Sequence, residues 1–248
     1  MALVAVAVAV VIGAALQSAA GFGFSLVVAP SLFHALNPGQ ALTAMVVMAL
    51  ALSLLMLFGE RRRPEIRTRE VALVVGWGVP GLIAGAVVLG LLGKPILQVA
   101  VGVVVVLAAG ADIVTFARAG AGPEAAPWPA FPAGLISGAL TTTTGVNGPP
   151  LLLWFQRLGA SQGEVRDSLA ACFASLAVLS ALVLLGAGML DLGPVTAPWL
   201  LLLILLVAVG RLAGREVFVR MPPDRFRTAG LVLAVVAGLT SIVAGVTI

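Results

Sequence analysis

The sequence predicts an all-α polytopic membrane protein built from two inverted repeats, each a glycine-broken helical hairpin followed by three transmembrane helices. Of its 248 residues, 61% are hydrophobic and 10% are charged, and the mean hydropathy is +1.17. Soluble domains carry about 25% charged residues and cannot hide this much apolar surface. Two glycine-rich breaks interrupt the apolar sequence, and their central glycines, Gly21 and Gly145, are 124 residues apart. Matching breaks in two halves are typical of transporters that bind a solute between repeats.

Six segments are each long and apolar enough to cross a bilayer once, which takes about 20 residues. They run over 40–58, 71–92, 95–117, 165–188, 194–212 and 225–247. Two longer apolar segments, 2–36 and 130–158, each contain one break and are too long for one ordinary span. Residues 1–16 carry no charged side chain. The basic region of a signal peptide is therefore missing, and we expect the first segment to be retained.

The distribution of basic residues indicates how the two longer segments lie in the membrane. The 14 Lys and Arg residues gather mostly in two connections, 59–70 and 213–227, and basic connections stay cytoplasmic. An odd number of membrane crossings between the two basic connections would place them on opposite sides. If 130–158 crossed once, the number would be odd, so both connections can be cytoplasmic only if 130–158 enters and returns as a hairpin. Applied to 2–36, the rule places the N-terminus outside and gives the halves opposite orientations. We expect a first repeat over 1–119, a linker over 120–129 and a second repeat over 130–248.

Each break places polar groups where half-helices meet. A half-helix that begins inside the membrane has unpaired N–H groups, and its N-terminus attracts an anion. Neither break contains Lys or Arg, which suits a small oxyanion that is held weakly and released. Close helix packing is the alternative explanation for such small residues, but two clusters at matching positions favour a site. The residues expected to bind the substrate are Gln17, Ser18, Gly21, Phe22, Gly23, Thr141, Thr142, Thr143, Thr144, Gly145, Asn147 and Gly148.

The remaining polar residues indicate structure rather than chemistry. Asp112 lies near a helix end, where we expect a solvated charge, and proton coupling through it is the alternative. We expect His34 in a loop, Cys172 in helix packing and the charged residues at 164–167 at the start of a helix. The pI of about 11.0 reflects the two basic connections rather than nucleic-acid binding. We expect no metal site, no cofactor and no enzymatic activity.

Two motifs carry a family resemblance. The first is Gln17-Ser18 followed by Gly21-Phe22-Gly23-Phe24 and Pro30, and the second is Gly134-Leu135-Ile136-Ser137-Gly138 followed by Gly145-Val146-Asn147-Gly148-Pro149-Pro150. At these motifs the chain resembles the sulfite exporter TauE/SafE family. Asn147 stands where that family commonly has glycine, and the run of four threonines is unusual for it. The resemblance covers essentially the whole chain and implies export of sulfite, sulfoacetate or other organosulfonates across the bacterial inner membrane.

The prediction is therefore a secondary carrier for a small anion that works by alternating access, with one half rocking against the other around the two breaks. Its partners would be the anion and the lipid bilayer, without nucleic acid, and a homodimer is left open. An anion channel is one alternative, since it would use the same breaks with faster flux that does not saturate. A non-transporting membrane scaffold is the other, since it would need only the packing glycines.

Overall fold

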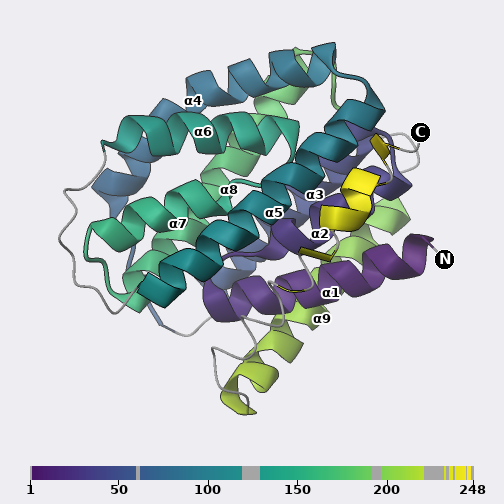
Figure 1. Ribbon diagram of the computed structural model, residues 1–248. Coiled ribbons are helices and arrows are strands. Elements are labelled where there is room, and N and C mark those ends of the chain that lie inside the picture. Colours follow the sequence, from purple (N-terminus) through teal and green to yellow (C-terminus); the bar gives the residue numbers. More distant parts are fainter. Residues whose placement is uncertain are drawn as a thin grey trace.

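The computed structural model of the protein describes residues 2–59, 62–118, 129–191 and 197–220, together with parts of 232–246. Within these residues the structure is all-helical (Figure 1). The helices with defined bounds are α1 (Ala2–Ala20), α2 (Phe24–Ala35), α3 (Pro38–Phe58), α4 (Thr68–Leu91), α5 (Lys94–Arg118), α6 (Ala130–Thr143), α7 (Gly148–Arg157), α8 (Gln162–Gly186) and α9 (Ala197–Arg220). Residues 238–243 are helical as well and pack on α5, where Ser241 Oγ donates to the Gln98 carbonyl at 3.0 Å.

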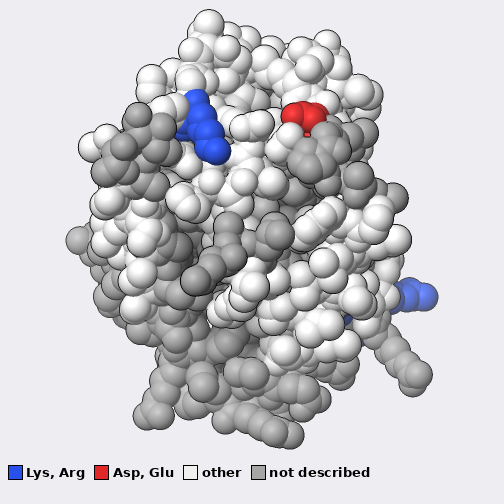
Figure 2. All heavy atoms as spheres, turned by 90° about the vertical axis from the view of Figure 1, so that its right-hand side faces the viewer, with Lys and Arg blue, Asp and Glu red and all other residues white. Residues whose placement is uncertain are grey.

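Three of these helices, α3, α4 and α8, are long and apolar enough to cross a membrane. Their outer faces and those of their neighbours carry large apolar side chains, such as Leu182 on α8 and Leu205 on α9, both exposed. Few charged side chains are visible among the described residues on the face that Figure 2 shows. Exposed apolar surface of this extent indicates that the helices lie in lipid.

Helices α3 and α8 begin with the same kind of cap. The N–H of Asn37 donates to Gln40 Oε1 at 3.4 Å at the start of α3. At the start of α8, the N–H of Ser161 donates to Glu164 Oε2 at 2.8 Å, and the Glu164 N–H donates to Ser161 Oγ at 3.2 Å. Both are capping boxes, in which two orphan N–H groups of the first turn are satisfied reciprocally. The two caps are 124 positions apart, the same spacing as the two breaks.

The third residue of each capping box also reaches across the molecule. Gln40 Nε2 donates to Asp191 Oδ2, just after α8, at 3.1 Å. Glu164 Oε1 accepts from Arg67 Nε, just before α4, at 3.2 Å. Asp191 follows Arg67 by 124 positions as well. These pairs hold the start of α3 against the residues that follow α8, and the start of α8 against the connection that follows α3, so α3 and α8 run antiparallel.

A buried carboxylate adds to the contacts at the start of α8. Asp167 is 3% exposed, and both its oxygens accept from Arg62, at 2.7 and 2.8 Å. The Glu65 N–H donates to the same carboxylate at 2.8 Å. Bidentate arginine pairing and a further N–H compensate the cost of burying the charge. The segment at 164–167 does begin a helix, as the sequence predicts, but its aspartate fastens the 62–67 connection to α8.

Helices α4 and α6 lie side by side with their backbones in close contact (Figure 1). A Cβ added at Gly81 would overlap the Leu135 carbonyl, and one added at Gly138 would overlap the backbone of α4. Thr142 Oγ1 donates to the Leu82 carbonyl across this interface at 2.8 Å. Only glycine permits so close an approach, which is a common way to pack helices in membranes.

Helices α1 and α9 pack in the matching way. A Cβ at Gly210 would overlap the Val11 carbonyl, and one at Gly214 would lie 2.6 Å from Ala15 Cα. Since α4 and α1 come from the first predicted repeat and α6 and α9 from the second, the closest interfaces join the two halves of the chain. The halves are therefore interleaved.

Some predicted boundaries differ from the structure. Helix α9 continues to Arg220, so 213–220 is helical where the sequence predicts a loop. Apart from Gly214, which packs against α1, the residues there are compatible with a helix, and the first strong helix breakers are the prolines at 222 and 223. His34 lies in the last turn of α2 rather than in a loop. The linker at 120–128 and most of the last predicted span lie outside the described residues, and so does the side chain of Asp112 in α5.

Candidate functional site

The first break separates two helices that fold back on each other. Helix α1 ends at Ala20 and α2 begins at Phe24, with Gly21 and Gly23 at φ of 86° and 110°. Glycine alone adopts such left-handed conformations without strain. Gly13 of α1 faces α2, and a Cβ there would lie 2.9 Å from the Phe24 carbonyl oxygen. The turn is therefore a hairpin, with the N-terminus of α2 at its tip.

The second break has the same form. Helix α6 ends at Thr143 and α7 begins at Gly148, with Gly145 at a φ of 72°. Asn147 occupies the N-cap of α7. Its side chain does not cap the helix, and Asn147 Nδ2 instead donates to Thr141 Oγ1 at 3.0 Å. This bond crosses the break and fixes the Asn147 amide on the inner side of the hairpin.

The two breaks meet inside the molecule. A Cβ at Gly148 would lie 3.5 Å from Phe22 Cβ, so the tips of the hairpins touch. Beside this contact is a cavity of about 30 Å³, the room of one ordered water or slightly more. The residues that line it are Gln17, Phe24, Ser25, Met45, Val46, Ala49, Thr141, Gly145, Asn147, Phe173 and Ala177.

Four of the predicted residues line this cavity: Gln17 from the first break and Thr141, Gly145 and Asn147 from the second. The others surround the breaks without lining it. They are Ser18, Gly21, Phe22, Gly23, Thr142, Thr143, Thr144 and Gly148. Ser18 Oγ is buried without a hydrogen-bond partner among the described residues. Binding of the substrate by any of these residues remains a prediction.

The four threonine hydroxyls donate to carbonyls of the protein. Thr141 donates to Ser137 at 2.6 Å, Thr143 to Ala139 at 2.8 Å and Thr144 to Leu140 at 3.1 Å, while the Thr142 hydroxyl donates to α4. Bonds to the carbonyl four residues earlier are usual for threonine within a helix. A hydroxyl that already donates has only lone pairs left to offer, and lone pairs repel an anion. The threonine run thus shapes the end of α6.

Donors for an anion come from other groups around the cavity. Gln17 is 4% exposed, and its Nε2 lies 3.9 Å from Met56 Sδ, a weak acceptor. Helix α2 begins at the cavity with Phe24 and Ser25, so its first N–H groups lack intrahelical partners. Helix α7 offers fewer such groups, because two of its first three residues are prolines. One half-helix thus supplies mainly backbone donors and the other mainly the Asn147 amide.

Sequence reasoning did not find the walls of this cavity. They come from α3, with Met45, Val46 and Ala49, and from α8, with Phe173 and Ala177. These residues are apolar members of long apolar helices, so their type carries no signal of a site. A positional signal exists, since Phe173 follows Ala49 by 124 residues, as Thr141 follows Gln17.

Folding also brings Arg166 of α8 against the first break, which contains no basic residue in its sequence. A Cβ at Gly21 would lie 3.3 Å from Arg166 Cα, so the tip of the hairpin rests on the backbone of α8 beside this residue. Side chains in contact with both breaks therefore come from helices far away in the sequence.

The family model for the sulfite exporter TauE/SafE family matches residues 5–241. Comparison with curated proteins and with solved structures finds no match. The matched range contains both breaks, the α3 and α8 walls of the cavity and the helices that carry the packing glycines. The chain therefore belongs to the sulfite exporter TauE/SafE family of membrane transporters.

Proposed function

We propose that the protein is a secondary transporter that exports a small sulfur-containing anion, such as sulfite, sulfoacetate or another organosulfonate, by alternating access. The observation that carries this proposal is the cavity at which both breaks meet. Gln17, Asn147 and the first N–H groups of α2 would hold the oxyanion, with Thr141 fixing the Asn147 amide. Neutral donors and a helix dipole bind an anion without the strong pairing that a buried arginine would impose.

The small size of the cavity supports a closed state around the site. At about 30 Å³ it is too small for a sulfonate unless Met45 or Phe173 moves. Transporters of this type bind the substrate when one side opens and enclose it when both are shut. The cavity belongs to such a shut state in the proposed cycle.

Repeated spacing supports the two inverted repeats of the proposal. The breaks, the capping boxes of α3 and α8 and the residues that pair with those boxes all recur after 124 positions. The glycine contacts repeat with a slightly different spacing, since Gly81 meets Leu135 and Gly210 meets Val11. Leu135 follows Val11 by 124 positions, and Gly210 follows Gly81 by 129. An interaction pattern that repeats when the halves are exchanged is what a pseudo-two-fold axis would generate.

The charges support a cytoplasmic location for one end of the molecule. Arg62 and Arg67 lie there beside the start of α8. A Cβ at Gly59 would lie 3.0 Å from Arg211 Nη2, so the basic end of α9 is close by. We assign this end to the cytoplasm by the positive-inside rule. The opposite end, with Gln40 and Asp191, would face outward.

Export is the favourable direction for an anion. An inside-negative membrane supplies about 2.3 kcal/mol per 100 mV for each negative charge that leaves the cell. This energy corresponds to roughly a fifty-fold concentration ratio. A coupled ion is therefore unnecessary in the proposed mechanism.

The test is anion transport by purified protein in liposomes, with Gln17→Met as the first variant. Methionine keeps the length of the side chain and removes the amide. We expect saturable efflux of sulfite or a sulfonate from wild-type liposomes and a loss of about tenfold or more in the variant, the effect of one well-placed hydrogen bond to an anion. Asn147→Ala should give a similar loss.

The matched control is Gln98→Met on α5. Gln98 is also buried and donates to the Phe33 carbonyl at 2.9 Å, away from the cavity, so its replacement should lower stability without a selective loss of transport. Wild-type flux in both Gln17→Met and Asn147→Ala would refute the site. Fast flux that does not saturate would indicate the channel alternative.

A further inference from the structure

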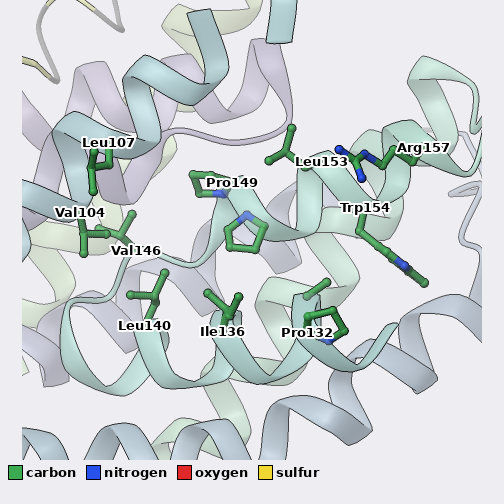
Figure 3. A pocket seen from close by; sticks show the side chains of 12 residues that line it. Val104, Leu107, Pro132, Ile136, Leu140, Val146, Pro149, Leu153, Trp154 and Arg157 are labelled. Carbon is green, nitrogen blue, oxygen red and sulfur yellow. The ribbon is translucent and has the colours of Figure 1, made fainter. Parts of the chain in front are cut away.

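A second cavity lies between α5, α6 and α7 (Figure 3). Its volume is about 320 Å³, within the range of about 300–1,000 Å³ that is usual for ligand pockets. Its described walls are apolar side chains apart from Arg157. Two of them, Leu107 at 67% and Ile136 at 46% exposed, lie at the surface of the bundle. The cavity therefore opens sideways, toward the region that lipid occupies.

Among the described residues that line it, the cavity has a polar side chain at one end only. Figure 3 shows Arg157 and Trp154 at one end and Val104, Leu107 and Val146 at the other. Arg157 lies in the last turn of α7, and a rise of about 1.5 Å per residue places Pro149 about 12 Å farther into the bundle. The cavity thus combines one basic end with an apolar interior.

Its basic end belongs to the end of the molecule that carries the other arginines. Arg67 Nη1 donates to the Leu158 carbonyl, next to Arg157, at 3.4 Å. In the topology proposed above this end is cytoplasmic, at the depth of the inner-leaflet phosphates. Tryptophan and arginine are the side chains that favour this depth, because each combines an apolar body with a polar end.

We propose that this cavity binds one acyl chain of an anionic phospholipid of the inner leaflet, with the lipid phosphate on Arg157. Basic pockets between helices on the cytoplasmic side bind anionic headgroups, and a guanidinium forms two parallel hydrogen bonds to a phosphate. The apolar walls give no partner to the substrate anion, whose desolvation they could not compensate. The ligand of this site is thus distinct from the transported solute.

The bound acyl chain would pack against the side of the second break that faces away from the substrate cavity. Val146 and Pro149 line the lipid cavity, and Asn147 between them lines the substrate cavity. One short segment of backbone thus separates the two sites. An acyl chain packed against Val146 and Pro149 holds the Asn147 amide toward the substrate, whereas an empty cavity leaves this wall unsupported.

The test is native mass spectrometry of the whole protein released from mild detergent, with equal amounts of phosphatidylglycerol and phosphatidylethanolamine added. We expect one phosphatidylglycerol to be retained in preference. In Arg157→Gln the preference should fall about fivefold, the effect of one surface cation on an anionic lipid. In Leu140→Trp, whose larger side chain fills the cavity, the bound lipid should be lost.

The matched control is Leu205→Trp, on the exposed face of α9 and away from the cavity. It should retain the lipid like wild type. Equal retention of both lipids, or retention unaffected by Leu140→Trp, would overturn the proposal.

A second measurement covers the case in which Leu140→Trp does not fold. Phosphatidylglycerol with a photoreactive group in its acyl chain, added to wild-type protein, should label 104–107 and 136–140. Labelling spread evenly over the outer helices would contradict the site. Neither readout requires transport, so a failure of the proposed function leaves this result interpretable.

Discussion

At the scale of single residues, the cavity is lined by pairs that occupy equivalent positions and differ in size or polarity. Ala49 on α3 and Phe173 on α8 are one such pair, and Gln17 and Thr141 are another. A site on a pseudo-two-fold axis would present the same side chain twice if the repeats were identical. The differences between the paired residues make this cavity asymmetric, with a bulky side chain on α8 only and with the amides of Gln17 and Asn147 at positions that are not equivalent.

Removal of the Phe173 side chain should change the size of the substrate that the cavity accepts. Phe173→Ala enlarges the cavity, so we expect transport of sulfoacetate to improve over sulfite by about tenfold, the lower end of the discrimination that one methylene group gives in a pocket. The ratio of kcat/KM for the two anions in liposomes measures this change. Phe33→Ala, at a buried position in α2, is the control and should leave the ratio unchanged. If Phe173→Ala leaves the kcat/KM ratio unaltered, the Phe173 side chain does not limit the size of the transported anion.

The buried carboxylate predicts a stability effect. Arg62→Ala leaves the Asp167 carboxylate without its bidentate partner, and we expect a loss of about 3 kcal/mol, the lower range for a broken buried pair because Arg62 is 40% exposed. Thermal unfolding in detergent measures the loss. Arg63→Ala, at an exposed neighbour, should have little effect. If the double variant Arg62→Ala with Asp167→Asn is no more stable than Arg62→Ala alone, the charge of Asp167 is not the cause.

At the scale of elements, two kinds of helix contact have different roles. The α4–α6 and α1–α9 interfaces are backbone to backbone across glycines, so neither helix can slide without a steric clash. The α3–α8 interface is held mainly at its ends by polar bonds, while its middle borders the cavity. The rigid α4–α6 and α1–α9 interfaces thus lie on either side of the α3–α8 interface. We expect the α3–α8 interface to open at one end or the other during transport.

Two glycines of α4 should respond in opposite ways to alanine. Gly81→Ala places a methyl group against the Leu135 carbonyl, and overpacking of this kind costs about 1–3 kcal/mol. Gly76 has no atom within 4 Å of an added Cβ, so Gly76→Ala should leave the melting temperature unchanged or raise it, since alanine favours helix more than glycine does. Equal destabilisation of both variants would argue that helix propensity, and not the α4–α6 contact, determines the effect.

At the scale of the whole molecule, the interleaving of the halves changes the expected motion. If one half of the chain rocked against the other, both glycine interfaces would have to come apart in every cycle. We instead expect α4 with α6, and α1 with α9, to move as units. Among the described contacts, two arginine–carboxylate pairs lie at the end that we propose to be cytoplasmic, and the Gln40–Asp191 bond lies at the other end. The outer end should therefore open more readily at rest.

Cross-linking can distinguish these motions. In a Cys172→Ser background, cysteines at Glu65 and Gly163, which lie in contact at the end that we propose to be cytoplasmic, should block transport when joined by a short thiol cross-linker. Cysteines at Trp77 and Phe131, whose rings meet between α4 and α6, should permit transport after the same treatment. Inhibition by the second cross-link would support rocking of the sequence halves. Continued transport with the first would mean that this end does not open.

The sequence by itself determined the membrane environment, the two broken hairpins, most helix boundaries and the family. Apolar content, runs of about 20 residues and glycine turns act locally, so they can be read along the chain. Only the tertiary structure decided that α3 and α8 wall the cavity, that Asp167 pairs with Arg62, and that the threonine hydroxyls bond to carbonyls and not outward. The physical reason is that contacts between distant helices depend on which faces meet, and in a chain this uniformly apolar few residues mark one face from another.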